Sequence, residues 1–435
     1  MPNVPLKKII TEKKFLPLIE QASVNFFKVI NCLKKDSPES KTFYANLSNE
    51  AELFEDFLDN HGARENKSWF YFTELIASIR NFAIAGLQLR HILDRYYHYK
   101  LEDSKDDAAK FHRDANSAMS FINNSVLDLF GILKKEASKN GMKHPKECYI
   151  DRAFSEIPIS KRLPKNLHED DLKDNEERII ALSRRFRNVA KLSKETNLEK
   201  FYKKETEIPV IPKIIDETKV QNFKNILQGI QSDYDTYIKN TFLEKNDKNL
   251  TKLRGFTSIC LHLLEIVRWL SHFFERHADE VRTGGIKEKI TKIVDRKEGL
   301  NTIINFAFFN SNDYLQKGKL IAEKILSKYT IKARYKLPPP KPLGFHARPA
   351  GYISLIVKEH GTDVFLVVDG KKFNARSVLS LMEAGGLIAD KGYHEVIFEG
   401  DKRALDDIKI LAEHNYCEDC EIPRELNYVR ILRNK

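Results

Sequence analysis

Apolar residues recur every three or four positions along most of the first 330 residues, the spacing of amphipathic helices. Residues 259–274 are one clear example. No proline lies between Pro38 and Pro145 or between Pro212 and Pro338, and glycine is scarce there, so the turns of a β-rich fold are lacking. The pattern predicts an all-α region with long helices, at residues 17–35, 48–60, 66–101, 105–140, 167–206, 217–245, 247–282 and 300–328.

The pattern changes after Thr330. Residues 331–336 alternate apolar and basic side chains, which predicts a strand with one buried face. Asp369-Gly370 is a hairpin-turn signal between two short β-branched or mixed runs. The order β-α-β-β-α-β-α predicts a small open-faced α+β sandwich, with strands at 331–336, 364–368, 371–374 and 394–398 and helices at 347–360, 378–384 and 402–414.

These patterns predict a multidomain chain, with an all-α bundle that could be duplicated and a C-terminal α+β domain. The motif L-x-H-h-h-[DE]-R, where h is apolar, occurs at 89–95 and again at 270–276, so a duplicated helical unit and a chance match both stay open. We expect a helical half-domain, a proline-containing connector, a second helical half-domain, an α+β domain and a tail, at residues 1–142, 143–166, 167–330, 331–416 and 417–435.

Composition restricts the classes of protein. The chain has 435 residues, of which 42% are hydrophobic and 31% charged, as in folded proteins. No segment is apolar enough to span a membrane, and no apolar signal-peptide core follows the first charges. Five cysteines, an odd and low number, argue against a disulfide scaffold and favour a reducing cytoplasm.

The formal charge of +11 is unevenly distributed. Residues 341–435 hold 14 basic and 15 acidic side chains, so the whole basic excess lies in residues 1–340. A positive field of this kind attracts phosphates, acidic protein faces or nucleic acid without selecting among them.

The segment richest in chemistry is Gly344-Phe345-His346-Ala347-Arg348-Pro349-Ala350. Proline is tolerated in the first turn of a helix, because the N–H that it lacks would have no intrahelical partner. His346 is therefore predicted at or next to the N-cap, beside main-chain N–H groups and the positive end of the helix dipole. Arg348 adds a cation that fits phosphate. An imidazole there could accept a phosphoryl group; the alternative is that His346 only caps the helix and Arg348 is solvated.

This heptapeptide resembles the active-site motif of the HPr family, the histidine phosphocarriers of the bacterial sugar phosphotransferase system. The resemblance covers roughly residues 331–416, and residues 374–382 resemble the family's second motif. It implies that His346 accepts a phosphoryl group on a ring nitrogen from phospho-enzyme I and passes it to a downstream protein, while Arg348 neutralises the phosphate. It also implies a carrier rather than an enzyme, with no metal or other cofactor and with phosphoenolpyruvate as the ultimate donor.

The second motif raises two further expectations. Ser377 lies where some HPr proteins are phosphorylated by a regulatory serine kinase, and it is also suited to cap the following helix. By resemblance, Val378, Leu379 and Met382 form an apolar partner-docking surface, unless they cover this domain's own sheet. The chain departs from the family after Ser377, where a few extra residues are expected to form a loop over 385–391. A free-standing HPr is also far smaller, which leaves residues 1–330 unexplained.

Two helical segments each carry a histidine, an acid three residues later and another potential ligand four residues after that. If pseudo-symmetry brought them together, they could hold a transition metal. The pattern faintly resembles the PhoU-like regulators, paired helical repeats with acidic metal motifs, although one acid is replaced by histidine. We expect instead an outward-facing network of ion pairs, with metal binding as the alternative. The residues concerned are His91, Asp94, His98, His272, Glu275 and Asp279.

Two remaining patterns carry little chemistry. His414, Cys417 and Cys420 form H-x-x-C-x-x-C without an obvious fourth zinc ligand, so we expect solvent-facing thiols. The densest basic run, 184–187 with Lys191, lies on a predicted helix and lacks a recognisable recognition fold, so nucleic acid is not an expected partner.

The sequence thus favours a cytoplasmic phosphocarrier or phosphorelay regulator that is phosphorylated on His346, with the helical region as its output or docking module. Its expected partners are enzyme I as donor, an unidentified acceptor protein and, at Ser377, a serine kinase. The alternatives are an interaction protein whose HPr-like domain transfers nothing, and a PhoU-like metal-binding regulator.

Overall fold

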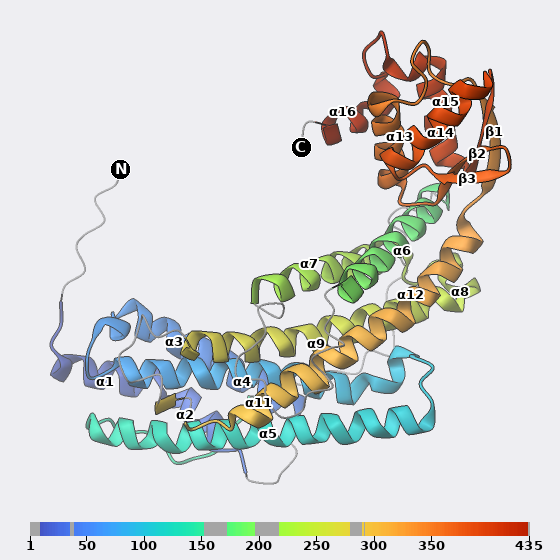
Figure 1. Ribbon diagram of the computed structural model, residues 1–435. Helices are drawn as coiled ribbons and strands as arrows, with labels where there is room; N and C mark the ends of the chain where they lie inside the picture. The colour runs from blue at the N-terminus through green and yellow to red at the C-terminus, as the bar shows by residue number, and fades with distance from the viewer. Residues whose placement is uncertain are drawn as a thin grey trace. The chain divides into compact units, whose positions relative to one another are not determined.

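The computed structural model describes residues 9–34, 39–151, 172–195, 217–278, 289–290 and 292–433. The chain divides into two compact units (Figure 1). The helical unit comprises Met1–Glu169 and Phe186–Ile321, and the α/β unit comprises Asp170–Arg185 and Ala322–Lys435. A mostly helical chain with a small sheet domain near its C-terminus is the layout that the sequence predicts.

The helices of the helical unit follow the predicted apolar periodicity closely. The predicted helix at 17–35 is divided at Ser23 into two shorter helices. Two segments, η6 and η7, are π-helical. The elements are α1 (Glu12–Ala22), α2 (Val24–Ile30), α3 (Lys41–Asn60), η1 (Ala63–Glu65), α4 (Phe70–Arg95), η2 (Tyr96–Tyr99), α5 (Lys105–Lys139), the second part of α6 (Leu172–Glu195), α7 (Glu217–Asp233), η6 (Tyr234–Ile238), α8 (Phe242–Asn246), α9 (Lys248–Ala278), α11 (Arg296–Asn301), η7 (Thr302–Phe308) and most of α12 (Phe309–Tyr329).

Helix α4 lies at the centre of the helical unit and packs against α3, α5 and α9. The rings of Phe82 on α4 and Phe273 on α9 are 4.9 Å apart. Gly255 permits close approach at the other end of α9, because a Cβ there would lie 1.8 Å from the carbonyl oxygen of Tyr99. Most of the two segments that the sequence assigns to separate half-domains therefore lies in one compact unit, where α4 and α9 form the main contact between them.

A disulfide joins Cys32, after α2, to Cys148, 116 residues further on. The chain after α5 returns along α2, where the side-chain amide of Asn31 donates to two main-chain carbonyls and Phe27 stacks on His144. The cysteine count argued against a disulfide scaffold and did not predict this single pairing. An odd cysteine count cannot reveal that the fold brings two distant positions together.

The α/β unit has the predicted β-α-β-β-α-β-α order. Its sheet has the strand order β1-β4-β2-β3, and all three pairings are antiparallel. The elements are β1 (Lys332–Leu337), α13 (Ala347–His360), β2 (Val364–Val368), β3 (Lys371–Asn374), α14 (Val378–Lys391), β4 (Val396–Asp401), α15 (Lys402–Glu413), η8 (Asn415–Cys417), η9 (Arg424–Leu426) and α16 (Asn427–Arg433).

Local signals determine how this sheet forms. The hairpin between β2 and β3 pairs Val368 with Lys371 across the two-residue turn Asp369-Gly370, whose φ values of 51° and 75° are both positive. Every second residue of β2 is buried. Helices α13, α14 and α15 lie on one face of the sheet and bury the core between themselves and the strands (Figure 1).

The structure corrects two boundaries in this unit. Residues 385–391, expected as a loop, continue α14, which ends at Gly392 in the left-handed conformation (φ 65°). Residues 417–435, expected as a tail, belong in part to the core, because Leu426 and Val429 are fully buried there. In addition, Arg184 from the first part of α6 forms a buried ion pair with Asp401, at 2.6 Å.

Within the described ranges, no helix is both long enough and apolar enough to cross a membrane.

Candidate functional site

His346 is the N-cap residue of α13, the position that the sequence predicts. The neighbouring residue Phe345 is 2% exposed and packs edge-on against the rings of Phe398 and Tyr416. Gly385 of α14 permits a close approach here, because a Cβ would lie 2.9 Å from the carbonyl oxygen of Phe345. The core therefore fixes the chain immediately before the histidine.

The imidazole of His346 faces the start of its own helix. Its Nδ1 accepts a long hydrogen bond, 3.5 Å, from the main-chain N–H of Arg348. The side chain is 31% exposed, so a reaction partner can reach it. A helix start leaves main-chain N–H groups without intrahelical partners and carries a partial positive charge.

Two charged side chains flank this imidazole. The guanidinium of Arg348 is exposed, and its Nη1 donates to the main-chain oxygen of Glu418 at 2.9 Å. The carboxylate of Glu418 lies on the other edge of the ring, with Oε1 at 2.9 Å from Nε2 of His346. Glu418 is 70 residues from Arg348 along the chain, and no local motif marks it, so sequence reasoning missed it.

The arrangement combines a nucleophile, an anion site and a cation. A neutral imidazole offers one nitrogen lone pair, and the helix start with Arg348 offers donors to negatively charged oxygens. Such a group can accept a phosphoryl group without a metal ion, because the charge on the phosphate is balanced by N–H donors and a guanidinium.

The predicted docking residues differ in their exposure. Leu379 is 78% exposed and Met382 is 38% exposed, both on α14. Val378, in contrast, packs partly against the core of the domain. Leu343, three residues before His346, is also largely exposed. Exposed apolar side chains therefore occur both on α14 and in the loop before the histidine.

Ser377 has the geometry of the helix cap. It is the N-cap residue of α14, and its hydroxyl accepts a hydrogen bond from the main-chain N–H of Ser380 at 3.3 Å. The cap interpretation is therefore confirmed, and phosphorylation of this serine stays a prediction.

The candidate metal ligands that the structure describes are not gathered into a site. Asp94 pairs with Arg90 one turn earlier, and Nδ1 of His272 lies 2.7 Å from Glu217. His98 is exposed. Asp279 lies outside the described residues. In the part of the chain that the structure describes, no three histidine, cysteine or acidic side chains are placed to hold a metal ion.

A different histidine contacts His91. The ring of His262 lies 4.4 Å from that of His91, and its Nδ1 is 2.7 Å from the amide oxygen of Gln88. Burial, with His91 and nearby cations, lowers the pKa of His262 to about 3. This histidine is therefore neutral at physiological pH, because burial disfavours the charged form of its ring.

The H-x-x-C-x-x-C residues do not form a zinc site. Nδ1 of His414 contacts the main-chain oxygen of Ile410, at 2.9 Å. Cys420 is exposed as expected, but Cys417 is buried, which corrects the prediction of two solvent-facing thiols. Burial and the neighbouring Cys420 raise the pKa of Cys417 to about 12, so its thiol stays protonated and unreactive at neutral pH.

The basic run on α6 is largely buried. Arg184 and Arg187 are 9% and 7% exposed, and Arg184 pairs with Asp401. These two arginines are therefore not presented to a nucleic acid backbone.

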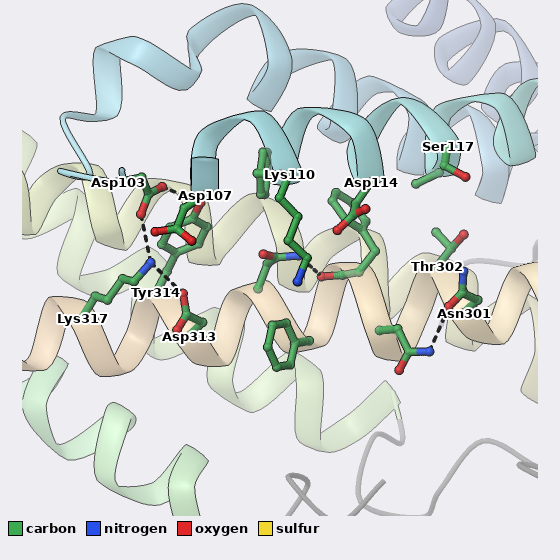
Figure 2. Close-up of a pocket in the computed structure, with 16 residues that line it drawn as sticks. Asp103, Asp107, Lys110, Asp114, Ser117, Asn301, Thr302, Asp313, Tyr314 and Lys317 are labelled. Carbon is green, nitrogen blue, oxygen red and sulfur yellow. Dashed lines mark hydrogen bonds and ion pairs between the residues drawn. The ribbon is translucent and has the colours of Figure 1, made fainter. Parts of the chain in front are cut away.

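The helical unit contains a groove of about 620 Å³ between α5 and the η7–α12 segment (Figure 2). Its most buried carboxylate, Asp103, already accepts hydrogen bonds from Tyr96, Tyr314 and Lys317, at 2.6, 2.9 and 2.9 Å. Lys317 also pairs with Asp313. Because these charged groups pair with one another, they are less available to a ligand than the imidazole at the start of α13.

Comparisons with family models, with curated proteins and with solved structures find no match to this chain. The choice among sites therefore depends on geometry, which favours His346.

Proposed function

We propose that this chain is a phosphocarrier or phosphorelay regulator of the HPr kind, which accepts a phosphoryl group on His346. The observation that carries the proposal is a partly exposed imidazole at the N-cap of α13, with its Nδ1 against the first-turn N–H of Arg348. The β-α-β-β-α-β-α order supports it, because this is the order of elements that the resemblance implies.

In this proposal, phospho-enzyme I is the donor, and a partner protein that docks near Leu379 and Met382 is the acceptor. The P–N bond in the donor breaks as the P–N bond to His346 forms. Arg348 and the N–H groups of α13 bind the phosphoryl oxygens during the transfer. The helical unit is the output or docking module.

We assign this activity to the cytoplasm, where phosphoenolpyruvate is available. A disulfide between Cys32 and Cys148 would be reduced in that compartment. The phosphocarrier activity does not depend on it, because the reacting residues lie in the other unit.

The test is phosphorylation of the full chain by phosphoenolpyruvate and enzyme I. The label should be acid-labile and alkali-stable, as a phosphoramidate is, and His346→Ala should abolish it. Arg348→Ala should keep the acceptor but lower the labelling rate roughly tenfold to a hundredfold, the effect of one charge-assisted contact. Wild-type protein that no enzyme I labels, including the enzyme from its own source, would leave a non-transferring interaction module.

A further inference from the structure

The carboxylate of Glu418 is buried against the imidazole of His346. Only 8% of the Glu418 side chain is exposed, and its Oε1 lies 2.9 Å from Nε2. Both atoms are shielded from solvent, and neither takes part in a hydrogen bond within the described residues, so they face each other as a charged contact at 2.9 Å. At that distance two bare lone pairs repel, so one of the two atoms carries a proton. An ionised carboxylate is costly to bury without a partner, so a proton on Nε2 is the state that this contact favours.

The turn that carries this carboxylate is held firmly in place. Its residues Asn415, Tyr416 and Cys417 have φ values of 47°, 54° and 57°, a left-handed conformation that costs a non-glycine residue of order 1 kcal/mol or more. Tyr416 is fully buried, and its hydroxyl donates to the main-chain oxygen of Pro338 at 2.8 Å. The side chain of Asn415 forms hydrogen bonds to both the N–H and the carbonyl of Lys341, at 2.9 and 2.7 Å.

Strained main-chain conformations that the surrounding structure over-determines cluster at functional sites. Here the strained turn ends one residue before the carboxylate that contacts the candidate acceptor. Glu418 also contacts Arg348, because the main-chain oxygen of Glu418 accepts a hydrogen bond from the Arg348 guanidinium. The turn therefore controls both the imidazole and its accompanying cation.

We infer that Glu418 is a positioning residue that keeps the neutral imidazole of His346 protonated on Nε2 and so leaves Nδ1 as the nucleophile. This inference rests on the proposed phosphoryl transfer to His346. It adds the residue that selects the reacting nitrogen, which the heptapeptide motif does not identify.

The chemistry balances without a proton leaving the ring. The lone pair of Nδ1 attacks phosphorus, the new N–P bond forms, and the departing donor nitrogen keeps the electrons of its own P–N bond. Because Nε2 keeps its proton, the phosphorylated ring of His346 is a cation. That charge faces the Glu418 carboxylate, which stabilises the phosphorylated ring and the transition state that resembles it. Transfer to the acceptor reverses these steps.

Nitrogen-15 NMR of the full chain with labelled histidine tests the proton position directly. The signal of His346 is identified by its loss in His346→Gln. We expect the Nε2-protonated form to dominate in the wild type and in Asp419→Asn, a control that removes an exposed carboxylate next to Glu418. Glu418→Gln should mix the two neutral forms, and Glu418→Asp should restore the preference in part.

Kinetics with enzyme I provide the second readout. Glu418→Gln should lower the maximal labelling rate roughly tenfold to a hundredfold while leaving the KM for enzyme I unchanged, because the effect is on the imidazole and not on docking. Asp419→Asn should match the wild type in both constants.

The outcomes separate the inference from the proposed function. Protonation of Nδ1 in the wild type, or Glu418→Gln labelled at the wild-type rate with an unchanged tautomer, overturns the role of Glu418 and leaves the phosphocarrier function intact. An Nε2-protonated wild type that depends on Glu418 but that no enzyme I labels supports the proton placement and overturns the phosphocarrier function.

Discussion

The two units of this chain use charged side chains in opposite ways. In the helical unit, the buried carboxylates of Glu55 and Glu74 are surrounded by arginines, with Arg80 and Arg276 at 3.1 and 2.8 Å. In the α/β unit, the imidazole of His346 is partly exposed and faces a helix start. Buried carboxylates whose charges are balanced by neighbouring arginines can stabilise a fold but offer little charge to a substrate. A partly exposed imidazole at a helix start can reach a substrate.

Energetics follow the same division. Burial raises the pKa of Glu55, whereas the charges of Arg80 and Arg64 oppose the rise. Each carboxylate pairs with two arginines, so removing one arginine leaves a buried carboxylate with half of its partners and destabilises the cluster. Around His346, one buried carboxylate, that of Glu418, lies at one edge of the ring, whereas main-chain N–H groups and the exposed Arg348 lie at the helix start, where a phosphoryl group would arrive. The charges of the helical cluster therefore serve stability, whereas those around His346 are suited to a reaction.

The largest effect should come from the buried ion pair between Arg184 and Asp401 in the α/β unit. Asp401 is 2% exposed, pairs with Arg184 and caps α15. Asp401→Ala should cost about 3–5 kcal/mol, since it removes a buried carboxylate that pairs with both Arg184 and Arg403. Hydrogen exchange of β4 and α15 peptides should speed up, while α4 peptides stay protected. Glu413→Ala, in an exposed pair with Lys409, is the control and should cost under about 0.5 kcal/mol.

Reduction of the disulfide should lower the stability of the helical unit and leave that of the α/β unit unchanged. Reduction, or Cys32→Ser with Cys148→Ser, removes a cross-link that closes a long loop and should cost the helical unit about 2–4 kcal/mol. Both tryptophans, Trp69 and Trp269, lie in that unit, so a denaturant titration followed by tryptophan fluorescence reports on it alone. A midpoint that reductant does not move would contradict this.

Acid should destabilise the helical unit through His262. Its folded-state pKa of about 3 lies below the ordinary value of 6.5, so the unfolded chain binds more protons between those limits. Stability is therefore full above pH 6.5 and falls as the pH is lowered, by up to about 1.4 kcal/mol per unit. His262→Gln should flatten that slope between pH 7 and 5, and His98→Gln, at an exposed site, should not. Equal slopes in all three proteins would refute the assignment.

Ser377 should give the smallest change. Ser377→Ala loses the cap of α14 and should cost about 1 kcal/mol, whereas Ser377→Gly should cost only about a few tenths. Neither should prevent labelling of His346. Ser377→Glu should slow labelling, because it places negative charge next to Leu379 on the docking face. Labelling of Ser377→Glu at the wild-type rate would argue against docking there.

Sequence reasoning succeeded where the determining contacts are local. The Asp369-Gly370 turn requires two positive φ values, and the residue types at those positions supply them. His346 could be placed at a helix start because Pro349 is compatible with a first helical turn. The order of strands and helices likewise follows from short-range apolar periods.

Reasoning failed where the fold joins distant positions. Glu418 contacts His346 only after the C-terminal segment folds back into the core through Leu426 and Val429. The loop expected at 385–391 is a helix, and its Gly385 lets α14 pack tightly against Phe345. No local pattern encodes such contacts, because each depends on the packing of elements that are far apart in sequence.

The central claim is that one imidazole among 13 histidines is the acceptor. The most direct measurement labels the full chain with phosphoenolpyruvate and enzyme I, digests it at alkaline pH and locates the phosphoryl group by mass spectrometry. The account predicts one phosphorylated peptide, which contains His346. A phosphoryl group on any other histidine, or on Ser377, with the His346 peptide unmodified, would contradict it.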